Sequence, residues 1–211
     1  MSQDRFPTKL FITGTDTGVG KSVVSAILMA GLRGIYWKPI QSGLEEMTDS
    51  DWIHAMTGLP ENHFLPEAYR LKRSCSPHAA AAAESLRIEL AAFELPETQE
   101  YLIVEGAGGI MVPLNERHFM LDLMKKLSIP VVLVTRSELG TINHTLLSLE
   151  QLRRKGLEMF GVVMNGPRNS ENRKALEHYG NVNVLAEIEP LPEINPQTLR
   201  LAFKKNFMLK V

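Results

Sequence analysis

One stretch near the N-terminus decides the fold: Lys9-Leu-Phe-Ile-Thr-Gly-Thr-Asp-Thr-Gly-Val-Gly-Lys-Ser22. Its first five residues read as a buried strand, and the amphipathic run Val23–Leu32 that follows predicts a helix. Glycines between them let backbone N–H groups converge on a phosphate, while Lys21 can reach the outer phosphates and the Ser22 hydroxyl can bind Mg²⁺. This order of strand, glycine-rich loop and helix predicts a phosphate-binding loop.

The match to the loop pattern G-x-x-x-x-G-K-[ST] is imperfect, because Thr15 stands where the first glycine is expected. An ordinary glycine-containing turn between strand and helix is the alternative. A second signal supports the phosphate loop: Glu105 closes the apolar run Tyr101–Val104 just before Gly106-Ala-Gly-Gly109. A carboxylate at the end of a buried strand is what such sites use to organise a metal ion, so the two signals together indicate Mg-ATP.

The rest of the chain alternates short β-branched runs with longer helical patterns, which favours βαβ units and a mainly parallel sheet. We expect a P-loop NTPase-type α/β fold, doubly wound with helices on both faces, in which residues 1–211 form one domain. Strands are expected at Lys9–Thr13, Gly34–Lys38, Tyr101–Glu105, Pro130–Thr135, Phe160–Asn165 and Val182–Ile188. Helices are expected at Ser22–Arg33, Asp49–Thr57, Pro77–Phe93, His118–Leu127, Thr141–Lys155, Ser170–Tyr179 and Pro196–Lys204, with Met47–Ser74 crossing the edge of the site as loop and short helix.

The charge balance and the cysteine content limit the kinds of ligand and the cellular compartment that we expect. The 211 residues carry 23 Lys and Arg against 24 Asp and Glu, for a formal charge of -1, so neither nucleic acid nor an anionic membrane is an expected ligand. The lone Cys75 and the lack of any apolar run near 18 residues favour a cytoplasmic protein. Cys75 reads as a semi-buried small residue or as a reactive thiol, the first being favoured.

A second lysine closes the next strand, in Lys38-Pro-Ile-Gln-Ser-Gly43. Lys38 and Ser42 should therefore lie at the same sheet edge as the phosphate loop. A lysine there could hold an extra negative charge near the γ-phosphate, or it could be a strand-end charge in water.

These segments together resemble the dethiobiotin synthetases of biotin biosynthesis. The resemblance rests on Gly14–Ser22, Lys38–Gly43, Asp51, Ser76-Pro-His78, Glu105–Gly109, Leu139–His144 and Asn165, which occur in the family's order over most of the chain. It implies a Mg-ATP-dependent ligase that closes a ureido ring from 7,8-diaminopelargonic acid and CO₂. A carbamate on one amine would attack the γ-phosphate, and the second amine would then displace phosphate.

The resemblance also assigns roles to residues. Lys21 and Lys38 would be catalytic, and Ser22, Asp51 and Glu105 would hold Mg²⁺. Substrate would contact Thr17, Ser42, Gly108, Thr141 and Asn143. ATP would contact Gly18, Val19, Gly20, Lys21, Ser22, Val23, Asp51, Glu105, Gly106, Ala107, Gly108, Asn165, Gly166, Ile188, Glu189 and Pro190. Asn165 would read the adenine edge.

In the family, the segment Gly140–His144 reaches across a two-fold interface, which implies a homodimer with shared sites. Three residues keep another interpretation open. Asp51 could complement a helix dipole, Asn143 could decorate a helix start, and His78 could anchor a helix as readily as contact substrate.

Three rival functions share this loop. Partner-switching ATPases of the partitioning type carry a signature lysine five residues before the loop lysine, a position that is Asp16 here. A non-catalytic relative would keep the fold without the ligase residues, whereas Lys38, Ser42, Asp51 and Glu105 are all present. A ligase acting on a different diamine is the third.

Overall fold

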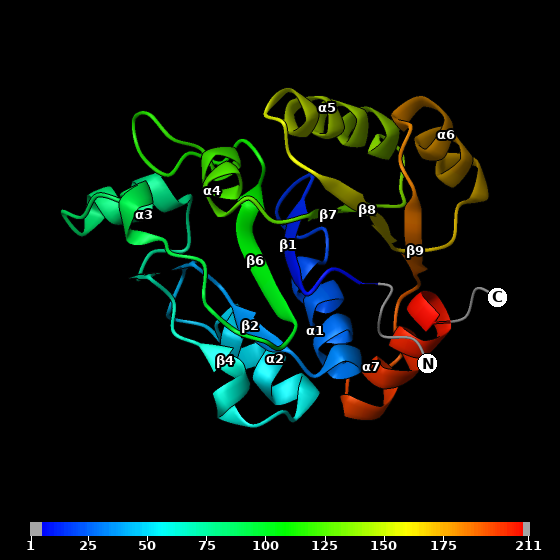
Figure 1. Ribbon diagram of the computed structural model, residues 1–211, viewed down its shortest axis with the longest axis horizontal. Coiled ribbons are helices and arrows are strands. Elements are labelled where there is room, and N and C mark those ends of the chain that lie inside the picture. Colours follow the sequence, from blue (N-terminus) through cyan, green and yellow to red (C-terminus); the bar gives the residue numbers. More distant parts are fainter. Residues whose placement is uncertain (1–5, 209–211) are drawn as a thin grey trace.

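The computed structural model describes residues 6–208, which are built around a seven-stranded sheet (Figure 1). The strands are β1 (Lys9–Gly14), β2 (Ile35–Trp37), β4 (Phe64–Leu65), β6 (Leu102–Gly109), β7 (Val131–Arg136), β8 (Met159–Asn165) and β9 (Val184–Ile188). They lie in the order β4-β2-β6-β1-β7-β8-β9, with every neighbouring pair parallel. The predicted doubly wound α/β fold is confirmed, with β6, β1 and β7 at its centre.

Helices cover both faces of this sheet. One face carries α1 (Lys21–Leu32), α2 (Asp49–Thr57) and α7 (Pro196–Phe203); the other carries α3 (Pro77–Ala83), α4 (Met120–Leu127), α5 (Thr141–Arg154) and α6 (Ser170–Gly180). Successive strand residues alternate between the two cores: Leu10 and Ile12 face α1, and Phe11 faces the opposite layer. Burial on both faces is why the central strands are apolar at every position. In the described range, no helix is long and apolar enough to cross a membrane.

The topology brings the carboxyl ends of the central strands to one edge of the sheet. In the β1–β6 ladder Ile12 lies opposite Glu105, and in the β2–β6 ladder Trp37 lies opposite Val104. The phosphate loop after β1, Glu105 in β6 and Lys38 after β2 are therefore neighbours. This edge is where ligands bind in open parallel sheets.

The predicted helix Pro77–Phe93 is too long. Helix α3 ends at Ala83, because Ser85 adopts a left-handed φ of 55° and the turn closes with Leu86 N donating to Ala81 O and Ser85 N to Ala82 O. This is a Schellman stop with serine in the place usually taken by glycine. Beyond it, only a 3₁₀ turn at Leu90–Ala92 follows, and Ile88 and Phe93 pack into the core from irregular chain.

Two further segments differ from expectation. Strand β6 continues past Glu105, the predicted strand end, to Gly109, which pairs with Gly14, so the glycines after Glu105 belong to the strand. Within Met47–Ser74, besides the predicted helix Asp49–Thr57, lie a 3₁₀ turn at Glu61–His63 and the short strands β4 and β5 (Tyr69–Leu71). Strand β5 pairs in parallel with β3 (Ile40–Ser42) as a separate two-stranded sheet beside the site.

Candidate active site

The loop between β1 and α1 has the backbone of a phosphate cradle. Gly18 and Gly20 have left-handed φ values of 72° and 94°, and Gly20 is the N-cap of α1. A side chain at Gly20 would collide with Asn165, so this turn requires glycine. Free N–H groups at the start of α1 and the positive end of its dipole face the loop, as an anion-binding site requires.

The loop borders a pocket of about 410 Å³ that is lined by Lys21, Ser22, Lys38, Asp49 and Glu105, among others. Lys21 is 7% exposed, and its Nζ donates to the Asp16 carbonyl oxygen at 3.1 Å. Burial lowers the pKa of Lys21 more than the nearby charge of Glu105 raises it. Lys21 is thus a poorly solvated ammonium group, for which a phosphate would supply the missing counter-charge.

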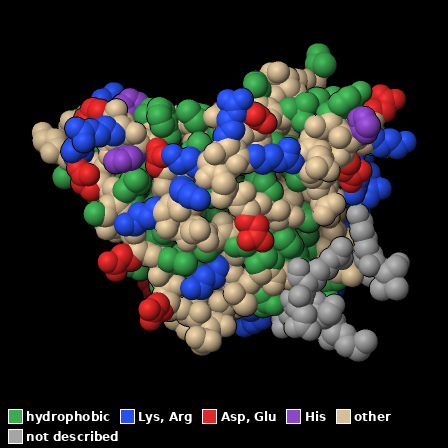
Figure 2. Space-filling view, turned by 45° about the horizontal axis from the view of Figure 1, so that its top comes forward, with side chains coloured by type: hydrophobic (Ala, Val, Ile, Leu, Met, Phe, Trp, Pro, Cys, Tyr) green, Lys and Arg blue, Asp and Glu red, His purple; other side chains and the backbone are tan. Residues whose placement is uncertain are grey.

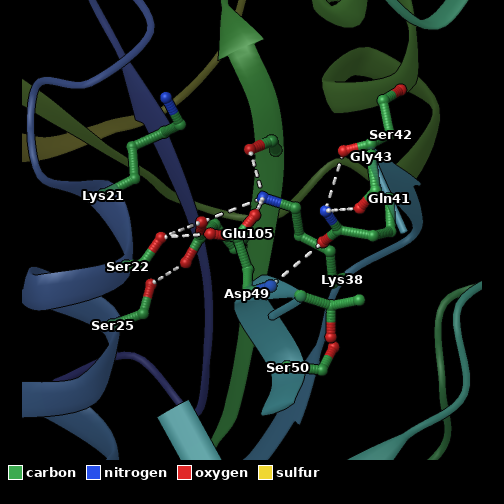
Figure 3. A network of polar contacts seen from close by, with 12 residues as sticks. Lys21, Ser22, Ser25, Lys38, Gln41, Ser42, Gly43, Asp49, Ser50 and Glu105 are labelled. Carbon is green, nitrogen blue, oxygen red and sulfur yellow. Dashed lines mark hydrogen bonds and ion pairs between the residues drawn. The ribbon is translucent and has the colours of Figure 1, made fainter. Parts of the chain in front are cut away.

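A cluster of two carboxylates, one hydroxyl and one ammonium group lies beside the loop (Figure 3). Ser22 Oγ donates to Asp49 Oδ1 at 2.7 Å and lies 3.0 Å from Glu105 Oε1. Lys38 Nζ lies 2.6 Å from Asp49 Oδ2 and 3.0 Å from Glu105 Oε1. Side chains from α1, α2, β6 and the residue after β2 therefore converge on one point.

Strand and helix periodicity explains why these side chains meet. Lys38 follows Tyr36 by two residues and Glu105 follows Ile103 by two, and Tyr36 and Ile103 both pack on the α1 side of the sheet. Ser22 lies on the first turn of α1, at the end nearest this edge. The fold consequently aims all three side chains into the space between α1 and the ends of β2 and β6.

Lys38 is almost fully enclosed, at 3% exposed, which contradicts its alternative interpretation as a solvated strand-end charge. Burial lowers the pKa of Lys38, but the charges of Glu105 and Asp49 outweigh burial and raise the pKa above its ordinary value. Burial likewise raises the pKa of Asp49, and the Lys38 charge with the Ser22 hydrogen bond brings it below its usual range. Lys38 is therefore held charged and Asp49 ionised.

The predicted metal ligand Asp51 does not lie in this cluster; Asp49 contacts Ser22 and Lys38 instead. Asp51 is exposed and turns back to the N-cap, where its Oδ2 accepts from Thr48 Oγ1 at 2.6 Å and its N–H donates to that oxygen at 3.1 Å. Thr48-Asp-Ser-Asp51 has the spacing of a capping box, in which the acid at the third helical position serves the cap. This spacing commits Asp51 to the helix cap, and Asp49, at the first helical position, can then contact Ser22.

The donors present fit a magnesium ion. Ser22, Asp49 and Glu105 offer only oxygen ligands, which Mg²⁺ prefers, and the Lys38 ammonium group already holds positive charge between the two carboxylates. Among residues 6–208, no group of three or more His, Cys, Asp or Glu side chains is placed to hold a metal ion, so this site has only two carboxylates and one hydroxyl to offer. An ion here would complete its shell with nucleotide oxygens and water.

A second pocket, of about 340 Å³, lies on the other side of Lys38. Thr17, Lys38, Asp49 and Gly108 line both pockets, and Ser42 lines only the second. The Ser42 hydroxyl oxygen is buried without a hydrogen-bond partner in the described chain, as expected of a group that awaits a ligand. Gly108 has a φ of 61°, which allows its backbone to lie at the pocket wall.

Ser76 and the exposed Cys75 also line this second pocket. The exposure of Cys75 contradicts its prediction as a semi-buried residue. His78 Nδ1 lies 3.1 Å from Ser76 Oγ at the start of α3. This contact agrees with an anchoring role for His78 at the helix start, one of its two predicted roles.

The predicted base-contact residues lie farther along the sheet edge. Asn165 Nδ2 donates to the Val19 carbonyl oxygen at 3.0 Å, which places the end of β8 against the phosphate loop. Ile188, Glu189 and Pro190 line a separate apolar hollow beside α7, and Glu189 pairs with Lys205 at 2.9 Å. Asn165 therefore contacts the loop, Ile188 lies beside Asn165 in the β8–β9 ladder, and none of the four lines the phosphate pocket.

Two predicted substrate residues lie outside both pockets. The Thr141 hydroxyl donates to the Arg136 carbonyl oxygen at 2.6 Å and lies 2.7 Å from Thr135 Oγ1, so its bonding capacity is used within the chain. Asn143 is exposed on the first turn of α5. Within one chain these residues are not joined to the site.

Comparison with known proteins gives two kinds of similarity. Residues 8–198 match a family described as an AAA domain. In architecture the chain is similar to a ParA family ATPase from Chlorobium tepidum, with a TM-score of 0.54 and 12% identity over 95% of this chain and 90% of that one. It is also similar to the cell division ATPase MinD of Pyrococcus furiosus, with a TM-score of 0.50 and 14% identity over 95% and 89% of the two chains. These likenesses establish the fold alone.

Sequence relatives are much more similar. The ATP-dependent dethiobiotin synthetase BioD of Paramagnetospirillum magneticum is 52% identical over 90% of this chain and 92% of its own length. The protein of the same name from Nitrobacter hamburgensis is 45% identical over 96% of this chain and 95% of its own. With the phosphate loop, the Lys38 cluster and relatives matched along nearly their whole length, the chain belongs to the dethiobiotin synthetase family.

Proposed function

We propose that the protein closes the ureido ring of dethiobiotin from 7,8-diaminopelargonic acid and CO₂, using ATP. The observation that carries this proposal is the position of Lys38. Its charged, buried side chain belongs to the wall of the phosphate pocket and to the wall of the second pocket. A phosphoryl donor in one pocket and an acceptor in the other would meet at this ammonium group.

The chemistry asks mainly for positioning and charge neutralisation. A carbamate formed on one substrate amine attacks the γ-phosphate with a carboxylate oxygen and gives a carbamic-phosphoric anhydride and ADP. The second amine attacks the carbonyl carbon, the C–O bond to phosphate breaks, and the ring closes. Lys21 would balance charge on the phosphates, and Lys38 would hold the carbamate and the charge that develops between the two reactants.

We propose that Ser22, Asp49 and Glu105 hold Mg²⁺. When bound, the ion would neutralise charge on the β- and γ-phosphate oxygens. Lys38 lies within ion-pair distance of both carboxylates, so it competes for the oxygens that a metal ion would use. When a metal ion takes part of this carboxylate charge, the Lys38 ammonium group would be free to contact the acceptor substrate.

A homodimer with shared sites is part of this proposal. Leu139, just before α5, is fully exposed, and Met111 and Leu147 are 48% and 59% exposed. Figure 2, which turns the upper side of Figure 1 forward, shows hydrophobic side chains exposed between charged ones along that side. A partner copy on this face would cover these side chains and could receive Asn143 at its second pocket. A cytoplasmic location stays a prediction.

Subunit mixing tests the shared site. If Lys38 and Asn143 act from different subunits, Lys38→Ala and Asn143→Ala proteins are each inactive, yet a heterodimer of the two regains one intact site. Random exchange should restore about a quarter of the sites. Inactive mixtures with proven exchange would contradict the shared site.

The function itself is tested by phosphate release from Mg-ATP in bicarbonate, with and without 7,8-diaminopelargonic acid, while the product is followed by mass. Phosphate that requires the diamine and matches ring-closed product one for one is the expected result. Phosphate release that ignores the diamine would instead indicate a switch ATPase, and no release would indicate a non-catalytic relative. A different diamine consumed in preference would redefine the substrate.

A further inference from the structure

The two carboxylate oxygens of Glu105 face different surroundings. Oε1 lies 3.0 Å from Ser22 Oγ and 3.0 Å from Lys38 Nζ, on the side of the phosphate pocket. Oε2 accepts hydrogen bonds from Ser25 Oγ at 2.7 Å and from Tyr36 OH at 3.2 Å. The dashed line from Ser25 to Glu105 in Figure 3 marks one of these contacts behind the cluster.

Neither hydroxyl can touch a nucleotide or a substrate. Ser25 and Tyr36 are both 0% exposed, and neither lines the phosphate pocket or the second pocket. Ser25 lies one turn after Ser22 on the same side of α1, and Tyr36 points toward α1 from the middle of β2. Any effect of these hydroxyls on the reaction must pass through Glu105.

Packing alone does not account for these hydroxyl groups. Both side chains are fully buried, Tyr36 within the apolar core on the α1 side, and Ser25→Ala or Tyr36→Phe would leave no polar atom to satisfy. The Tyr36 ring packs against Phe64, with ring centroids 6.0 Å apart, which the oxygen atom does not aid. What the two oxygens add is a pair of donors to one carboxylate oxygen.

A carboxylate without such donors can rotate and exchange its two oxygens. With Oε2 bound twice in the core, the plane of the Glu105 carboxylate is set, and Oε1 is presented to Ser22 and Lys38. Outer partners of metal ligands commonly act in this manner, and removing one typically costs about 10–100-fold in metal affinity or activity.

We propose that Ser25 and Tyr36 are positioning residues that orient Glu105 for the metal ion. The inference rests on the proposed function, because it takes Glu105 to be a metal ligand. It adds two buried residues, which line neither pocket but hydrogen-bond to Glu105, on which metal affinity depends.

Binding of Mn²⁺, a paramagnetic substitute for Mg²⁺, tests the proposal by electron paramagnetic resonance on the full-length protein with saturating ADP. We expect Ser25→Ala and Tyr36→Phe each to raise the Mn²⁺ dissociation constant about tenfold, and the double variant to raise it up to about 100-fold. Ser25→Thr retains the hydroxyl and should bind Mn²⁺ nearly as the wild type does. Tyr36→Phe keeps the shape of the core and remains informative should Ser25→Thr fold poorly.

Thr57→Val is the matched control, since Thr57 has a buried hydroxyl that donates to Ile53 O within α2, with no contact to Glu105. It should lower the unfolding midpoint without changing Mn²⁺ affinity. Wild-type Mn²⁺ affinity in Ser25→Ala and Tyr36→Phe, with Glu105→Gln strongly weakened, would overturn the positioning role and leave the metal site standing. Wild-type affinity in Glu105→Gln as well would overturn the metal site.

Discussion

Two buried lysines line the same pocket under opposite electrostatic conditions. Lys21 is 7% exposed and Lys38 is 3% exposed, yet burial leaves the pKa of Lys21 below its ordinary value, whereas Glu105 and Asp49 raise the pKa of Lys38 above it. Lys21 contacts a backbone carbonyl, and Lys38 contacts two carboxylates. The difference teaches that the Lys21 ammonium group has no carboxylate partner among the contacts described and suits an external anion, whereas the Lys38 ammonium group has two carboxylate partners within the chain.

The largest expected effect follows from removing Lys21. In Lys21→Ala, the phosphates lose their nearest cation both on binding and during transfer, so ATP affinity and turnover should fall together. We expect kcat/KM for ATP to fall about 10³-fold, as for loss of a major transition-state contact. Steady-state kinetics with a separate measurement of ADP binding would show this. Unchanged nucleotide affinity would break the distinction between the two lysines.

Lys38→Ala should separate binding from turnover. Because Lys38 faces the acceptor side, ATP affinity should be nearly unchanged while kcat falls about 10²–10³-fold. Nucleotide affinity by calorimetry and kcat by product formation provide the two numbers. Small, equal effects on both would remove Lys38 from the mechanism.

In the absence of nucleotide, the pKa shifts of Lys21 and Lys38 predict opposite effects of these two charges on the free energy of unfolding. Lys21 has a folded-state pKa below that of the unfolded chain, so its charge opposes folding at neutral pH, and stability rises as pH passes upward through the folded value. Lys38 has a raised folded pKa, so its contribution is complete below the unfolded pKa and is lost as pH rises through the folded one.

Urea unfolding at pH 8 should therefore show Lys21→Met to be at least as stable as the wild type. Lys38→Met should be less stable by about 3 kcal/mol, because it leaves two carboxylates uncompensated. Both differences should shrink as the pH approaches and passes about 10.4, the ordinary lysine pKa. Lys21→Met less stable than Lys38→Met would contradict the comparison.

The smallest effects come from the neighbouring acids. Asp49→Asn should raise the Mg²⁺ concentration needed for half-maximal activity about tenfold. Asp51→Asn should leave that requirement unchanged and cost about 1 kcal/mol or less of stability through the N-cap. Metal titrations and urea unfolding of both variants are the measurements, and a larger metal effect from Asp51→Asn would restore the original assignment.

The surroundings of Lys21 can be predicted from the sequence more completely than those of Lys38. The Lys21 loop is local: strand, glycines and helix are contiguous, so Gly20, Lys21 and Ser22 could be placed without tertiary information. The Lys38 cluster joins residues from α1, α2, β6 and the chain after β2, and only the family resemblance indicates from sequence that such segments belong together. Asp49 and Asp51 are two residues apart, and only the structure shows that Asp51 bonds to the Thr48 cap while Asp49 bonds to Ser22.

Two other features also could not be predicted from the neighbouring residues in the sequence. A run of alanines predicts a helix but does not say that Ser85 will take a left-handed conformation and end it. Ser25 and Tyr36 read as ordinary core positions, since nothing in their neighbourhood along the chain shows that both point to Glu105. Contacts of this kind require the sheet order.

The most direct test of the proposed function follows the oxygen atoms. With ¹⁸O-labelled bicarbonate and rapid quenching, a carbamate that attacks the γ-phosphate must carry one labelled oxygen into phosphate and leave one in the ureido carbonyl. We predict equal labelling of phosphate and product in the presence of 7,8-diaminopelargonic acid, with neither formed by Lys38→Ala at a comparable rate. Unlabelled phosphate released under the same conditions would mean that water is the acceptor, and would contradict the ligase.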